Sequence, residues 1–265
     1  MIIMQRILAR QHSGYWKENK TGDLGTTDKK SSHKIRHRKI PRAHSGQKEK
    51  MYMKELRFLD ELVQRYPVLG PVKGDILKAY EIMRECYENG GKLMIAGNGG
   101  SCSDSEHIVG ELMKGFVKRR PVSEELARAL KAADPQMGEI LADNLQGGLA
   151  AIALTGHCAL TTAYSNDVNG DLTFAQQLYG YAKKGDVFLG ITTSGNSKNV
   201  LYAAAAAKAL GVTVIGLTGR DGGRIKDFSN VSIVVPEQET FKIQELHLPV
   251  YHALCLMLED HFYES

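Results

Sequence analysis

The chain has 265 residues, of which 43% are hydrophobic and 24% are charged, a composition typical of a soluble globular protein. It contains no apolar stretch of roughly 20 residues that could cross a bilayer and no pattern typical of a secretory signal. Its four cysteines are scattered without a CxxC pair, which argues against a disulfide framework or a thiolate zinc site. We therefore expect a cytoplasmic protein.

The net charge of +4 is unevenly distributed along the chain. Residues 1–50 carry 13 Lys and Arg against 4 Asp and Glu (+9), whereas residues 51–265 carry 21 against 26 (−5). A basic segment can bind nucleic acid, but this one has little apolar mass and no periodicity, so we predict a disordered tail without a nucleic-acid partner. Met51 is a natural start, and we expect residues 1–50 to be an upstream translation or expression artefact.

Residues 51–265 are expected to form one α/β domain. Apolar residues recur at helical spacing between Lys54 and Glu88, and Pro67 and Pro71 divide this region into two helices. Five short apolar runs predict buried strands, beginning at Lys92, Leu149, Asp186, Val212 and Val231. Helical segments alternate with them at 101–118, 123–133, 172–183, 199–210 and 240–261. Strands that alternate with helices predict a three-layer sandwich around a five-stranded parallel sheet, preceded by a helical hairpin.

Ligands of such sheets bind beyond the carboxyl ends of the strands, where three polar loops are expected: Gly97–Ser105, Ser165–Asp171 and Thr192–Asn199. The last loop carries four hydroxyl residues, Thr192, Thr193, Ser194 and Ser197, immediately before a helix. Hydroxyls and the amides of a helix start favour a phosphate group. A simple helix cap would need only one or two of these residues. Because no GKS/T lysine is present, a phosphate monoester fits better than a nucleoside triphosphate.

The glycine-rich segment GNGGS at residues 97–101 does not match the dinucleotide fingerprint GxGxxG, and no acidic residue ends a following strand. We therefore reject a Rossmann site, and we expect these glycines to let a ligand approach the backbone closely.

The helix after this turn carries His107 and Glu111, four residues apart on one face. The last helix adds Gln244, His247 and His252 to an otherwise apolar face. Each could be an ordinary surface pair or a buried core histidine, but together they suit a divalent metal or acid–base catalysis. Gln244 and His252 lie roughly 12 Å apart along a straight helix. Sharing one metal would therefore need extended side chains, a late helix start or a bend at Pro249.

Five motifs, in this order, resemble the sugar isomerase (SIS) domain of the phosphoheptose isomerase family: GNGGSCSDSEHIVGEL, SND, TTSGNSKNV, GLTGRDGG and KIQELHLPVYH. They span nearly the whole domain. The resemblance implies a flavodoxin-like sheet, a homotetramer with sites near subunit boundaries, and one zinc ion per site. It also implies an aldose–ketose isomerase that converts sedoheptulose 7-phosphate to glycero-manno-heptose 7-phosphate through an enediol, for heptose glycoconjugates.

The resemblance also implies roles for individual residues. The zinc positions are His107, Glu111, Gln244 and His252, and the acid–base candidates are Glu111 and His252. Phosphate contacts fall on Thr192, Thr193, Ser194 and Ser197. Sugar contacts fall on Asn98, Gly99, Gly100, Ser101, Asn166, Asp167 and Gln244.

The chain departs from the family pattern by an insertion at about residues 122–148, which predicts two short helices broken at Asp134-Pro135. It follows the helix of His107 and Glu111, so it could cover the site or extend a subunit interface. Phe241 and Pro249 are also unexpected at their positions. These differences leave two alternatives open, an isomerase of another sugar phosphate and a non-catalytic sugar-phosphate sensor or partner of a replication initiator.

Overall fold

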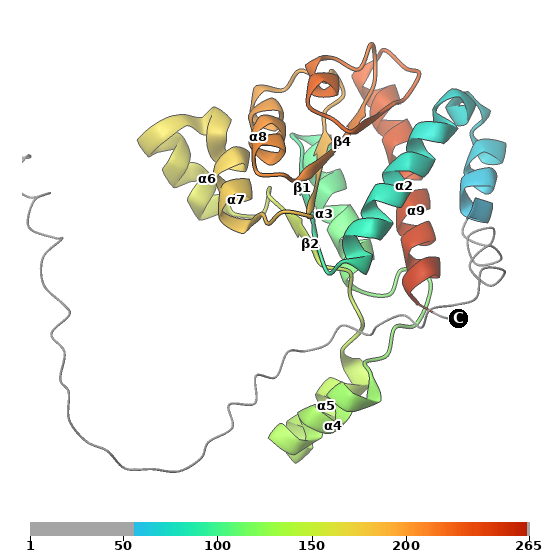
Figure 1. Ribbon diagram of the computed structural model, residues 1–265, viewed down its shortest axis with the longest axis vertical. Coiled ribbons are helices and arrows are strands. Elements are labelled where there is room, and N and C mark those ends of the chain that lie inside the picture. Colours follow the sequence, from blue (N-terminus) through green and yellow to red (C-terminus); the bar gives the residue numbers. More distant parts are fainter. Residues whose placement is uncertain (1–55, 264–265) are drawn as a thin grey trace, which may run out of the picture. The chain divides into compact units, whose positions relative to one another are not determined.

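Five parallel strands form the sheet in the computed structural model, which describes residues 56–263 (Figure 1). The strands are β1 (Leu93–Ala96), β2 (Ala151–Ala153), β3 (Val187–Ile191), β4 (Thr213–Thr218) and β5 (Val231–Val234). Their spatial order is β2-β1-β3-β4-β5, and every neighbouring pair is parallel. This is the flavodoxin-like order, so the expected sheet is confirmed. The expectations for residues 1–50 and for a start at Met51 lie outside the described residues.

Both faces of the sheet are buried, which explains why its strands read as continuous apolar runs. In β1, Leu93 and Ile95 point into one core cluster while Met94 and Ala96 point into the other. This alternation follows from the two-residue period of a strand. Because both faces of β1 and β3 pack on a core, their sequences show no alternation of polar and apolar residues.

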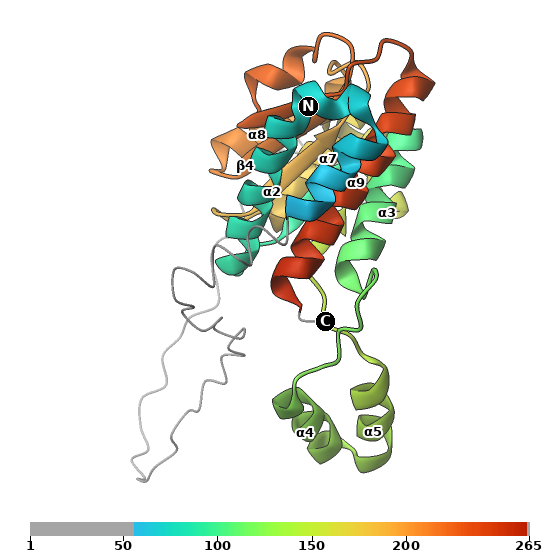
Figure 2. The same ribbon diagram turned by 90° about the vertical axis from the view of Figure 1, so that its right-hand side faces the viewer.

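Helices cover the two faces in separate layers. The first core cluster lies under α2 (Lys73–Glu88), α3 (Gly100–Met113) and α9 (Thr240–Phe262), and Figure 2 shows these three helices together. The second cluster lies under α7 (Thr173–Tyr181) and α8 (Lys198–Ala209). The chain enters the domain through helical residues 56–65 and the 3-10 helix η2 (Pro67–Val72), so the two prolines do interrupt the first helical region.

Two expectations about local structure were wrong. The loop expected at Ser165–Asp171 is helical: α6 (Cys158–Tyr164) continues into a π-helical turn, η3 (Ser165–Asn169), and a 3-10 turn, η4 (Gly170–Leu172). Its hydroxyls bond back to the preceding turn, as when Ser165 Oγ donates to the Thr161 carbonyl at 2.6 Å, so polar composition did not mean a loop. In addition, α3 ends at Met113 instead of reaching Lys118.

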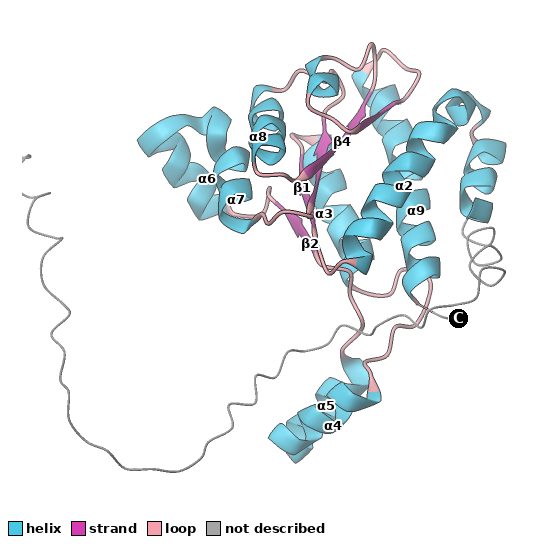
Figure 3. Cartoon of the chain, in the orientation of Figure 1, coloured by secondary structure: helices cyan, strands magenta, loops and turns pink. Residues whose placement is uncertain are grey.

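The insertion forms the two helices that its sequence predicts, α4 (Glu124–Ala133) and α5 (Pro135–Asn144), which pack mainly against each other (Figure 3). Ser123 caps α4 by accepting from the Leu126 N–H, and Asp134 caps α5 in the same way ahead of Pro135. An isolated antiparallel bridge between Pro121 and Gln146 closes the base of this hairpin. Within residues 56–263, no helix is long and apolar enough to cross a membrane.

Candidate functional site

The loops that follow β1 and β3 meet where the strand order reverses, the usual ligand position in this class of sheet. They are joined by a reciprocal pair of amide hydrogen bonds. Asn98 Nδ2 donates to Asn199 Oδ1 at 2.9 Å, and Asn199 Nδ2 donates back to Asn98 Oδ1 at 2.8 Å. Asn98 was predicted to contact the sugar, whereas no sequence pattern singled out Asn199. The pair fixes the glycine-rich turn against the loop Thr192–Asn199, which we call the hydroxyl loop.

The glycine-rich turn has the backbone geometry that its composition suggested. Gly99 precedes α3 with a φ of +57°, a conformation that favours glycine, and its surroundings are open. Gly100 lies directly against the side-chain amide of Gln244, so that a β-carbon there would overlap it. Asn98, Gly99 and Gly100 are exposed at the sheet edge, where a ligand can reach them. Ser101 is only 3% exposed and packs against Gly97, which leaves it the least accessible of the predicted sugar contacts.

The hydroxyl loop does not use its hydroxyls as an ordinary helix cap. Ser197 stands at the N-cap position of α8, yet its side chain accepts no hydrogen bond from that helix. Its Oγ instead lies 2.9 Å from Thr192 Oγ1, inside the loop. The Ser194 hydroxyl accepts from the Asn196 N–H at 3.2 Å. The first amides of α8 are thus not capped by Ser197, which is the arrangement that an anion-binding helix start requires.

The segment between β4 and β5 packs directly against the backbone of the hydroxyl loop. Gly195 has a φ of +67°, and a β-carbon there would overlap the carbonyl oxygen of Gly222. The Ile225 N–H donates to the Gly195 carbonyl at 3.0 Å, and the Arg224 N–H donates to Asn196 Oδ1 at 3.1 Å. The GLTGRDGG segment therefore shapes the hydroxyl loop through its glycines.

Three of the four predicted zinc positions gather between α3 and α9. His107 Nε2 lies 3.2 Å from Glu111 Oε1, and the rings of His107 and His252 are nearly perpendicular with their centroids 5.0 Å apart. Glu111 Oε2 and His252 Nε2 are both buried without a hydrogen-bond partner. Burial, followed by the nearby His107, lowers the pKa of His252 and so favours its neutral form. Glu111 Oε2 does make an ion pair with Lys114 Nζ at 3.9 Å. The two atoms are a carboxylate oxygen and an imidazole nitrogen, the donor types that zinc accepts.

Gln244 lies apart from those three residues, against Gly100 at the opposite end of the helix pair. The helix α9 starts at Thr240 and continues past Pro249 to Phe262, so a late helix start does not shorten the distance. In residues 56–263, no group of three or more His, Cys, Asp or Glu residues is gathered closely enough to hold a metal ion. His247 is fully buried in the same helix, and burial lowers its pKa to about 4, so it is a neutral core residue.

Asn166 and Asp167 lie on the exposed turn η3, where Asn166 Nδ2 donates to Asp167 Oδ1 at 2.9 Å. The next turn, η4, packs against α8, the helix that follows the hydroxyl loop.

The sequence analysis did not identify a buried ion pair between Glu259 and Arg120, which we call the buried anchor. The Glu259 carboxylate accepts from the Arg120 guanidinium at 2.9 Å and from the backbone N–H groups of Phe116, Val117 and Lys118. Burial tends to raise the pKa of Glu259, but these hydrogen bonds and the arginine together lower it. Arg120 also donates to the Glu111 carbonyl at 3.2 Å, which connects the anchor to the end of α3.

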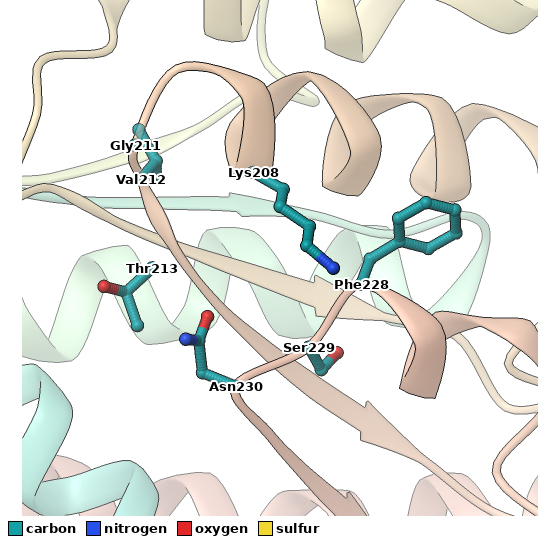
Figure 4. A pocket seen from close by; sticks show the side chains of 7 residues that line it. All are labelled: Lys208, Gly211, Val212, Thr213, Phe228, Ser229 and Asn230. Carbon is teal, nitrogen blue, oxygen red and sulfur yellow. The ribbon is translucent and has the colours of Figure 1, made fainter.

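The pocket in Figure 4 lies at the other edge of the sheet. Its lining comes from the segments that lead into β4 and β5, Gly211–Thr213 and Phe228–Asn230, together with Lys208. It contains none of the predicted site residues. We therefore place the site at the carboxyl edge, where the two loops meet.

Comparison with known proteins gives a consistent result. The family model described as "SIS domain" matches residues 135–219. The phosphoheptose isomerase of Nitratiruptor sp. is 41% identical over 71% of this chain and 86% of its own length, and that of Helicobacter hepaticus is 38% identical over 70% and 81%. Among solved structures, the phosphoheptose isomerase of Neisseria gonorrhoeae is 31% identical with a TM-score of 0.57, covering 81% of this chain and 97% of that one. That of Francisella tularensis is 30% identical with a TM-score of 0.58, covering 82% and 98%.

Proposed function

Because this chain belongs to the phosphoheptose isomerase family of SIS-domain proteins and is therefore a sugar-phosphate isomerase, we propose that its substrate is sedoheptulose 7-phosphate. The product is then D-glycero-D-manno-heptose 7-phosphate, a precursor for heptose glycoconjugates. The observation that carries this proposal combines two features: a hydroxyl loop before a helix whose N-cap side chain makes no cap hydrogen bond, and a separate cluster of Glu111 and His252. The loop suits the phosphate, and the cluster suits proton transfer at the distant carbonyl end.

The length of the site favours an open-chain sugar. Gln244 lies beside the glycine-rich turn, and His252 lies eight residues further along α9, roughly 12 Å of helix rise. An open-chain heptose with a terminal phosphate is long enough to engage both ends. Sugar hydroxyls along the chain can bond to Asn98 and Gln244, which are polar side chains at the glycine-rich turn.

In the proposed reaction, Glu111 removes a proton from C1 of the ketose, and the electrons of the C1–H bond form the C1–C2 double bond as the C2 carbonyl becomes an enediolate oxygen. Neutral His252 then takes the proton of the hydroxyl on C1 and delivers it to the oxygen on C2. Glu111 finally returns its proton to C2. The result is an aldehyde at C1, and both residues regain their starting protonation.

We also propose that His107, Glu111, Gln244 and His252 hold one zinc ion. Glu111 Oε2 and His252 Nε2, which are buried without a hydrogen-bond partner, are donors of the right type. When bound, zinc would polarise the substrate carbonyl as a Lewis acid. Elemental analysis of the purified protein should give about one zinc per subunit. Removal of zinc by a chelator should abolish isomerisation, and added zinc should restore it.

We further propose that the protein acts in the cytoplasm as a homotetramer. The exposed positions of Asn166 and Asp167 support an assembly, because they leave both side chains open to contact from a neighbouring subunit. Light scattering coupled to size-exclusion chromatography should give four times the subunit mass. A monomer that isomerises the sugar at full rate would refute this assembly.

The substrate can be tested by incubating the zinc-loaded protein with sedoheptulose 7-phosphate in deuterium oxide. We expect deuterium to enter C1 of the ketose and C2 of the aldose, because the enediol exchanges its carbon-bound proton with solvent. No exchange with this sugar, but exchange with a different ketose phosphate, would reassign the substrate. Tight binding without exchange of any sugar phosphate would indicate a sensor instead of an enzyme.

The role of Glu111 can be tested with Glu111→Gln, which keeps the size of the side chain but removes the base. We expect kcat to fall by at least about 10²-fold, the contribution of a general base. A matched control is Glu106→Gln, since Glu106 lies on the same helix but is exposed and accepts from Thr155 Oγ1 instead. Near-normal turnover of Glu111→Gln would refute the assignment of Glu111 as the general base.

A further inference from the structure

Tyr251, on α9, connects two residues of α3 that the proposed chemistry does not link. Its hydroxyl oxygen lies 3.0 Å from His107 Nδ1 and 3.3 Å from Asp104 Oδ1. Asp104 and His107 are three residues apart and face α9 from the same side of α3. Tyr251 itself is 2% exposed, so water does not compete freely for these hydrogen bonds. Asp104, Tyr251, His107 and Glu111 thus form a continuous polar row.

The direction of the two hydrogen bonds at the Tyr251 hydroxyl follows from which of the three groups has a proton to donate. Tyr251 has a single hydroxyl proton to donate, and a carboxylate can only accept. Asp104 Oδ2 is buried without a hydrogen-bond partner, and Oδ1 has Tyr251 as its donor. If the tyrosine proton pointed elsewhere, this carboxylate would lose that donor, which is costly for a buried charge. The proton therefore goes to Asp104, and the tyrosine oxygen is left to accept from His107.

That direction determines which nitrogen of His107 carries a proton. Nδ1 must be protonated to donate to Tyr251, so the lone pair of a neutral ring lies on Nε2. This nitrogen is 3.2 Å from Glu111 Oε1, an oxygen that also only accepts. Two acceptors at this distance repel each other unless a proton or a metal ion lies between them. The row therefore presents the lone pairs of His107 Nε2 and Glu111 Oε1 together to one cation, either a proton or a metal ion.

We propose that Tyr251, held by Asp104, is a positioning residue that fixes the ring orientation and the Nδ1-protonated tautomer of His107. Carboxylates or carbonyls usually hold the second nitrogen of a metal-binding histidine, and here a buried phenol performs that task on behalf of a carboxylate. The inference deepens the proposed function by assigning a residue that supports His107, and it rests on the proposed zinc site only for its effect on metal affinity.

The tautomer can be measured directly in Tyr251→Phe, which removes the hydroxyl but keeps the ring. Two-bond proton–nitrogen spectra of histidine-labelled protein distinguish the tautomers, and loss of signals in His107→Gln identifies the residue. We expect Nδ1 protonation in the wild type, and a shift in Tyr251→Phe to Nε2 protonation, since Nε2 can then donate to Glu111. An Nε2-protonated wild type, or a tautomer unchanged by the substitution, would overturn the proposal.

Tyr87→Phe is a matched control, because the Tyr87 hydroxyl is also buried but has no hydrogen-bond partner in the described structure. It should leave the His107 spectrum unchanged. Cobalt titration gives a second measurement, in which Tyr251→Phe should weaken binding about 10- to 100-fold and Tyr87→Phe should not. Equal cobalt affinity in Tyr251→Phe and wild type would contradict the positioning role. A wild type that binds no cobalt would refute the proposed metal site, while the tautomer measurement would still decide the role of Tyr251.

Discussion

The substitution Glu259→Gln tests how strongly the buried anchor stabilises the fold. Of the two carboxylate oxygens, Oε1 accepts from the Phe116 N–H and the Arg120 Nε, and Oε2 accepts from the N–H groups of Val117 and Lys118. A glutamine replaces one oxygen by an NH₂ group. Whichever way the amide is oriented, two of the four hydrogen bonds are lost, and the buried Arg120 loses its counter-charge.

The expected loss of stability can be estimated in two independent ways. Hydrogen bonds to charged groups contribute about 1.5–3 kcal/mol each, so losing two costs about 3–6 kcal/mol. Breaking a buried ion pair by removing one partner costs about 3–5 kcal/mol. Both estimates agree on about 3–5 kcal/mol for the free energy of unfolding. At about 2–4 °C per kcal/mol for a domain of this size, the expected fall in Tm is about 6–20 °C.

Urea unfolding followed by circular dichroism, at one fixed protein concentration, measures this loss. The folded-state pKa of Glu259 lies below its usual 4.5. Its carboxylate therefore stabilises the fold above that pH, and the contribution is lost as the pH falls through the folded-state pKa. The difference between wild type and Glu259→Gln should be full at pH 7 and shrink below about pH 4.5. As a control, Glu139→Gln on the exposed hairpin should leave unfolding unchanged. A loss below about 1 kcal/mol for Glu259→Gln at pH 7 would refute the reasoning.

Two further predictions concern the loops at the sheet edge. Gly195→Ala should lower the free energy of unfolding by about 2–4 kcal/mol and raise KM, because its β-carbon overlaps the Gly222 carbonyl at a positive φ. The control Gly180→Ala, in open space near the end of α7, should instead leave stability unchanged or raise it by up to about 1 kcal/mol in the same urea assay. Asn199→Ala should raise KM about five- to tenfold with little change in kcat, since it removes the amide that holds Asn98. An unchanged KM in steady-state kinetics would show that the amide pair has no part in binding.

The parts of the fold that were predicted from the sequence depend on local periodicity. Strands buried on both faces and helices with one apolar face leave a regular pattern, so all five strands were found at their expected places. The helical turns at Cys158–Asn169 were missed because their polar residues satisfy the backbone of their own helix. Composition alone does not distinguish such a helix from a loop.

The parts of the site that were missed depend on contacts between distant segments. Tyr251 looked like one more apolar residue of the last helix, and only its position beside Asp104 and His107 gives it a role. Asn199 and Arg120 escaped for the same reason, since their partners lie far away in the sequence. The doubt about Gln244 and His252, in contrast, followed from helix rise alone, and α9 is helical from Thr240 through Pro249, without the late start that would shorten their separation.

The anchored base of the insertion has a consequence for proteolysis. On the entering side, Arg120 is held by Glu259, and on the leaving side, the Gln146 side chain accepts from the Gly115 N–H at 2.8 Å. The Gly147 N–H also donates to the Arg120 carbonyl at 2.7 Å, directly across the base. A protease that cuts within the exposed hairpin would therefore release neither end. The two fragments would stay together under native conditions and separate only in a denaturing gel.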